Sequence, residues 1–104
     1  MFSLSYKNQV LRCELESTDY YYGLKIIATF YDEDCCNSLG KIGFITHLSE
    51  CGLTELELRK GIKEALIQGR CESKLEAMLQ WQSELQKLGY VEVAPISCRF
   101  CGIF

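Results

Sequence analysis

Alternating apolar and polar residues dominate the first half of the chain. Residues 2–6 alternate in this way, and residues 11–15 do so again after the turn-like segment Lys7-Asn8-Gln9. A period of two is typical of a β-strand with one buried and one solvated face. The pattern therefore predicts an N-terminal hairpin.

Two further strands are predicted before residue 48. Ser17-Thr18-Asp19 breaks the alternation, and the aromatic and β-branched run of residues 20–31 predicts a third strand, which should be the most buried. Residues 32–40 form a polar stretch with turn residues, and residues 41–47 return to strand composition. The first half thus predicts a four-stranded meander.

The periodicity changes in the middle of the chain, where two helices are predicted. Thr54 and Glu57 fit a capping box at the start of the first helix, and Gly69 fits the position after its end. Ser73 and Glu76 suggest a second capping box, and Gly89 would close that helix. The apolar stripes expected on the two helices are Leu58, Ile62, Ala65 and Leu66 on the first, and Leu75, Met78, Trp81, Leu85 and Leu88 on the second.

The last predicted strand covers residues 90–94 and ends at Pro95, which cannot donate a hydrogen bond to a neighbouring strand. The short link between the helices predicts an antiparallel helical hairpin. The expected fold is α+β, in the order β-β-β-β-α-α-β. It is an antiparallel sheet of a four-stranded meander plus the C-terminal strand, packed on the helical hairpin.

Composition narrows the class of protein. A length of 104 residues without a linker-like stretch predicts one domain over 1–104. A net charge of −3 with scattered basic residues argues against a nucleic-acid partner and against an anionic membrane surface. The first thirteen residues lack the pattern of a signal peptide, so we expect a cytoplasmic location and reduced thiols for this cysteine-rich chain, which has 7 cysteines.

Cys98 and Cys101 form the sharpest local motif, since two thiolates at this spacing can bind one zinc ion. His47 and Cys51 are the candidates for completing the four ligands. The motif lacks a second pair at standard spacing, so buried thiols without a cofactor are the favoured interpretation and a structural zinc the alternative. A redox dithiol is disfavoured because the pair follows a strand and a proline, and not a helix N-terminus.

Two segments resemble known enzyme families. Phe30-Tyr31-Asp32 and residues 40–47 resemble the strand-loop-strand of chemotaxis receptor-glutamine deamidases, and residues 75–94 resemble their C-terminal part; Lys25 stands where that family has its nucleophilic cysteine. Residues 59–66 resemble the pyrophosphate-binding turn of acetyltransferases, although here the segment lies inside a predicted helix. Each resemblance implies at most a degenerate enzyme, deamidase-like or acyltransferase-like, and neither is adopted as the family of this chain.

Since no complete catalytic or metal-binding motif stands out, we expect a small regulatory or protein-interaction domain that binds another protein without catalysis. A homodimer is one form that this interaction could take. The residues expected at the interface are the apolar and aromatic side chains of the tyrosine run and the tail: Tyr21, Ile96, Phe100, Ile103 and Phe104.

Overall fold

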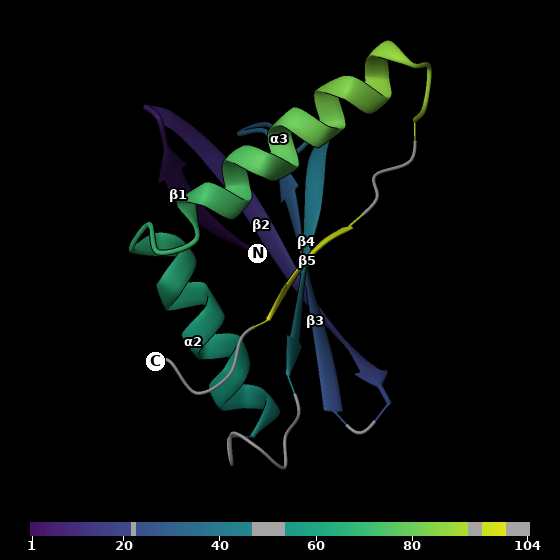
Figure 1. The fold of residues 1–104 in the computed structure, drawn as a ribbon. Coiled ribbons are helices and arrows are strands. Elements are labelled where there is room, and N and C mark those ends of the chain that lie inside the picture. Colours follow the sequence, from purple (N-terminus) through teal and green to yellow (C-terminus); the bar gives the residue numbers. More distant parts are fainter. Residues whose placement is uncertain (22, 47–53, 92–94, 100–104) are drawn as a thin grey trace.

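A computed structural model describes residues 1–21, 23–46, 54–91 and 95–99. These residues form an α+β domain in the predicted element order (Figure 1). The strands and helices are β1 (Phe2–Tyr6), β2 (Gln9–Tyr20), β3 (Gly23–Tyr31), β4 (Ser38–Thr46), α2 (Glu55–Ile67), α3 (Glu72–Lys87) and β5 (Pro95–Arg99).

The sheet has the strand order β1-β2-β3-β4-β5 and is mixed. The first four strands form the predicted antiparallel meander, whereas β5 lies parallel to β4 and pairs with Lys41–Ile45. The expectation of a fully antiparallel sheet is therefore wrong. The reason is the connection: the two helices carry the chain back along the sheet before β5 begins, as parallel pairing requires.

The position of the last strand also differs from the prediction. Tyr90 and Val91 lie outside any strand, and residues 92–94 are outside the described residues. Pro95 begins β5 and does not end the strand before it. The first residue of a strand tolerates proline because its missing N–H need not enter the ladder.

Tight turns set the register of the meander. Lys7 and Asn8 both have positive φ, 46° and 65°, as a two-residue hairpin turn requires, so Gln9 already belongs to β2. The predicted break at residues 17–19 is wrong, because β2 continues to Tyr20, which pairs with Gly23. The polar residues 17–19 fit this strand because their side chains are exposed or half-buried.

The start of α2 is confirmed. The Thr54 Oγ accepts a hydrogen bond from the Glu57 amide at 3.2 Å, and the Thr54 hydroxyl lies 3.1 Å from the Glu57 carboxylate, to which it donates. The helix ends before Gly69, whose φ is +78°. The second capping box is wrong: α3 begins after Cys71, which makes no side-chain capping hydrogen bond.

We expect Thr54→Ala to lower the free energy of unfolding by about 1 kcal/mol, the usual cost of losing an N-cap hydrogen bond. Urea unfolding followed by circular dichroism measures this change. Thr18→Ala on β2 is the control, because it removes the same hydroxyl outside a helix cap. Equal effects of the two substitutions would contradict the capping role of Thr54.

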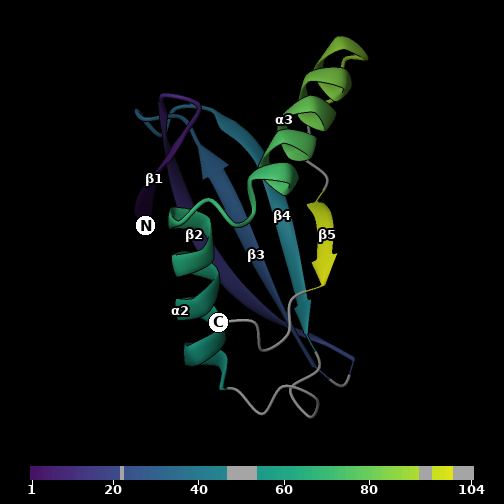
Figure 2. The same cartoon turned by 60° about the vertical axis from the view of Figure 1, so that its left-hand side comes forward.

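Both helices cover the same face of the sheet (Figure 2). They follow one another along the sheet and point in the same general direction, so the expected antiparallel hairpin is not formed. The buried residues of both helices belong to one core together with residues of the strands. The core joins side chains from the sheet and from both helices: Leu4, Tyr6, Leu11, Cys13, Leu24, Ile26, Ala28, Phe30, Ile42, Phe44, Leu58, Ile62, Ala65, Leu66, Cys71, Leu75 and Met78.

The C-terminal part of α3 projects past the end of the sheet (Figures 1 and 2). The buried residues of this helix are Leu75, Met78 and Gln82, and none of its residues after Gln82 is buried. The rest of the domain therefore covers few side chains in the second half of α3.

Candidate interaction surface at the end of helix α3

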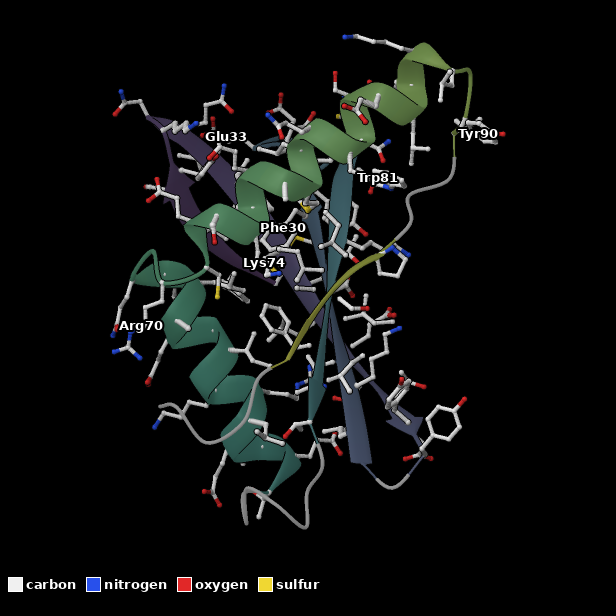
Figure 3. The ribbon with its side chains drawn as sticks, in the orientation of Figure 1. Phe30, Glu33, Arg70, Lys74, Trp81 and Tyr90 are labelled. Atoms are coloured by element: carbon white, nitrogen blue, oxygen red, sulfur yellow. The ribbon has the colours of Figure 1, made fainter. Side chains whose placement is uncertain are left out.

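Exposed apolar side chains gather at the end of α3. Trp81 and Leu88 were predicted to lie in the buried stripe, but they are 46% and 73% exposed. Tyr90 and Val91, directly after the helix, are 62% and 90% exposed. Figure 3 shows Trp81 on α3 and Tyr90 on the segment that follows this helix. Large apolar groups concentrated in this way mark an interaction surface more often than isolated ones do.

A groove of about 530 Å³ lies between this end of α3 and the start of β4, and we call it the α3 groove. Its volume falls in the range of ligand-binding clefts. The lining residues come from the β3–β4 loop, β4 and the end of α3, and none of them carries a charge: Cys36, Asn37, Ser38, Leu39, Leu79, Gln82, Ser83, Gln86, Tyr90 and Val91.

Two buried polar atoms of the α3 groove lack a hydrogen-bond partner. Gln82 is only 6% exposed, and its Oε1 makes no hydrogen bond. The Oγ of Ser38 is in the same situation on the opposite wall. A buried polar group without a partner typically costs about 1–3 kcal/mol, so a glutamine here reduces stability relative to an apolar residue. Both atoms are closed to solvent, so a ligand in the groove would reach the Gln82 oxygen only if the side chain turned outward.

The β3–β4 loop that forms one wall is held by Asp32. Its carboxylate accepts hydrogen bonds from the Cys36 amide at 2.9 Å and from the Asn37 side chain at 3.0 Å. Desolvation acts to raise the pKa of Asp32, but the hydrogen bonds from Asn37 and from the loop amides outweigh it and lower this pKa. The acidic turn thus uses a carboxylate to position Asn37, a groove residue.

The hydrogen bonds to Asp32 predict a pH-dependent contribution to stability. Because its pKa is lowered in the folded state, the contribution is fully present above the unfolded pKa and is lost as pH falls through the folded value. Carbon-detected NMR titration should give a midpoint below the ordinary 3.8. Asp32→Ala should destabilise the protein more at pH 7 than at pH 2. A midpoint at or above 3.8 would contradict this prediction.

The predicted zinc ligands are largely untested. Cys98 lies in β5, while His47, Cys51 and Cys101 lie outside the described residues. Within the described part of the chain, no three His, Cys, Asp or Glu side chains are grouped closely enough to hold a metal ion. Cys13 and Cys71 are core residues, and burial raises the pKa of Cys13 to about 12. Cys35 and Cys36 are exposed in the β3–β4 loop.

The residues predicted at an interface have varied positions. Tyr21 is 87% exposed at the β2–β3 turn, whereas Ile96 is half-buried and packs against the core. Phe100, Ile103 and Phe104 lie outside the described residues. Sequence reasoning missed Gln82 and Ser38. The spacing of three and four residues from Leu75 through Met78 leads to Gln82, and this signal could have placed a polar residue in the buried stripe.

The structure bears on one of the two segments that resemble enzyme families. Residues 59–66 lie inside α2, so the acetyltransferase-like segment does not lead from a strand into a helix. Comparison with protein-family models, curated proteins and solved structures gives no match. Among the described residues, no helix has both the length and the apolar character needed to cross a membrane.

Proposed function

We propose that this domain binds another protein without catalysis, and that the binding site is the α3-end surface. This surface consists of the α3 groove together with Trp81 and Leu88. The observation that carries the proposal is the exposure of Trp81 and Leu88 on α3, together with that of Tyr90 and Val91, which line a groove whose wall includes the buried Gln82. Aromatic and apolar groups around a few polar atoms are typical of the centre of a protein interface.

The chemistry of the groove supports binding rather than reaction. Its polar lining consists of amides and hydroxyls, which position a partner through neutral hydrogen bonds. The thiol of Cys36 is the most nucleophilic group among the described lining residues, and its Sγ lies 3.5 Å from the carbonyl oxygen of Asp34. Among the described residues that line the groove, none is acidic, basic or histidine.

The test compares the wild-type protein and two variants as affinity baits in extract of the native host. Leu88→Ser with Tyr90→Ser removes two exposed apolar groups of the α3-end surface. Ile67→Ser is the matched control, since Ile67 is also an exposed apolar residue, 50% exposed, but lies at the end of α2. A partner of the α3-end surface should be recovered by wild-type protein and by Ile67→Ser, with at least about a tenfold loss for the double variant.

Gln82→Leu separates the role of the groove wall from that of the exposed apolar residues Leu88 and Tyr90. Because it removes an unpaired buried oxygen, this substitution should leave stability unchanged or increase it by up to about 2 kcal/mol, while it weakens partner binding. Sedimentation velocity on the same variants reports whether the partner is a second copy. Partners recovered equally by wild type and by all α3-end variants would contradict the proposal.

A further inference from the structure

Strand β2 is much longer than its neighbour β1. β2 runs from Gln9 to Tyr20, but β1 pairs with it only from Gln9 to Cys13. Along residues 14–20, β2 has β3 on one side and no other described strand on its opposite side. Figure 2 shows β1 ending while β2 continues across the sheet. This stretch is an open sheet edge inside the domain.

The hairpin turn determines which backbone groups face that edge. A two-residue turn makes Tyr6 and Gln9 a hydrogen-bonded pair, and every second residue of β2 then directs its N–H and C=O to the β1 side. Beyond the end of β1 these residues are Leu15, Ser17 and Asp19. The guanidinium of Arg59 supports this alternation, since it donates to the Leu15 carbonyl at 2.9 Å.

A pocket of about 550 Å³ lies between this edge and α2, next to the N-terminal end of β1. Its walls come from the first residues of β1, the middle of β2 and one side of α2: Met1, Phe2, Cys13, Glu14, Leu15, Leu56, Arg59, Lys60 and Lys63. An additional strand that continued the line of β1 would enter this pocket. We call the pocket and the β2 edge together the edge slot.

On the side of α2, basic and apolar side chains line the edge slot. Arg59, Lys60 and Lys63 project from α2, and Leu56 is 77% exposed among them. Lys63 Nζ lies 5.4 Å from the centre of the Phe2 ring. The other face of β2 carries Glu14 and Glu16, both exposed. A strand in the slot would therefore meet cations on its helix side and carboxylates on its other side.

We propose that the edge slot binds an extended segment of a partner protein, which adds to β2 as a strand at Leu15–Asp19. The segment carries carboxylate and apolar side chains toward α2, alternating with neutral or basic side chains toward Glu14 and Glu16. Main-chain hydrogen bonds to an open edge supply affinity, and alternate side chains supply specificity. This site is separate from the α3-end surface and does not depend on it.

Binding would change the role of Arg59. In the structure Arg59 donates to Leu15 and to the Ser17 hydroxyl, the latter at 3.1 Å, and lies 4.0 Å from the Glu55 carboxylate. An incoming backbone N–H would replace Arg59 at the Leu15 carbonyl. The guanidinium would then be available for a carboxylate of the bound segment. Its hydrogen bonds to this charged acceptor would be stronger than the one to the neutral Leu15 carbonyl.

The probe is a fluorescent nonapeptide in which threonine alternates with valine and glutamate, so that valine and glutamate share one face. Anisotropy titration should show saturable binding that weakens with salt. Replacing the peptide glutamates by lysine should weaken it at least about tenfold, and Lys60→Glu with Lys63→Glu should reverse this preference. N-methylation of the peptide backbone on its pairing side should abolish binding without any change in the protein.

Two proline substitutions test the assignment to the β2 edge. Ser17→Pro removes an N–H that faces the edge slot and should abolish binding. Ser5→Pro is the matched control, because by the same alternation the Ser5 N–H faces the outer side of β1. Thermal melting verifies that both variants are folded. Amide hydrogen exchange should show protection at Ser17 and Asp19 when the peptide is bound.

Three results would overturn the proposal. One is that the glutamate peptide does not bind saturably, and another is that N-methylation of its backbone leaves binding unchanged. The third is that Ser5→Pro abolishes binding while Ser17→Pro does not. A wild-type dimer that Ser17→Pro dissociates would assign the edge slot to a second copy of this chain and would also overturn it. Loss of partner recovery in Leu88→Ser with Tyr90→Ser leaves this test unaffected.

Discussion

Replacing Phe30 with alanine is expected to lower the free energy of unfolding by about 3–5 kcal/mol. Phe30 lies in β3, is 0% exposed, and Figure 3 shows it beneath α3. Its neighbours in the sheet are Cys13 and Gly40, both buried. Because these neighbours are small, a truncated side chain leaves a cavity that they cannot fill. Small domains have about 5–15 kcal/mol of stability in total, so this loss would unfold a measurable fraction of the protein.

Urea unfolding, followed by both circular dichroism and tryptophan fluorescence, measures the change. Tyr31→Ala is the control, because Tyr31 is the next residue of β3, points to the opposite face of the sheet and is only half-buried. It should cost much less than Phe30→Ala. Comparable losses in the two variants would show that the helix-covered face is not the principal core of the domain.

The parts of the fold that sequence reasoning predicted correctly are those with a local physical cause. Period-two alternation predicted the N-terminal hairpin, strand-like composition predicted the next two strands, and the Thr54 cap with Gly69 gave both ends of α2. Where local signals compete, the prediction failed. The polar residues 17–19 looked like a break, but backbone pairing with β3 keeps them in β2. Ser73 resembled an N-cap, yet α3 starts earlier, with Cys71 in the core.

The candidate sites could not be predicted in the same way, because each joins segments that are distant in the chain. Ser38 and Gln82 both line the α3 groove, and no local pattern connects the two residues. The edge slot depends on the difference in length between β1 and β2, which appears only when the register is known. Trp81 was assigned to the buried stripe because helical spacing permits it. The buried side chain at this level of α3 is that of Gln82, the next residue, and Trp81 is left 46% exposed.

Gly40 is the position where a single added carbon should have the next largest effect. It begins the part of β4 that lies against α3, and its φ is +150°, which side chains rarely adopt. A Cβ at this position would lie 2.5 Å from Met78 Cγ and 2.8 Å from Met78 Sδ. Both distances are too short for non-bonded atoms. The missing side chain of Gly40 therefore allows Met78 of α3 to lie against β4.

We expect Gly40→Ala to cost about 1–3 kcal/mol, from overpacking and from backbone strain together. Gly69→Ala is the control for a Cβ at positive φ without a collision, because Gly69 has a φ of +78° and a Cβ there meets nothing within 4 Å. Combining Gly40→Ala with Met78→Ala removes the collision, so the double variant should be more stable than the sum of the single losses predicts, by about 1 kcal/mol or more. Chemical unfolding of the four proteins in this cycle measures the coupling. Strict additivity would mean that Met78 moves aside without cost, and α3 would then not be held on β4 by this contact.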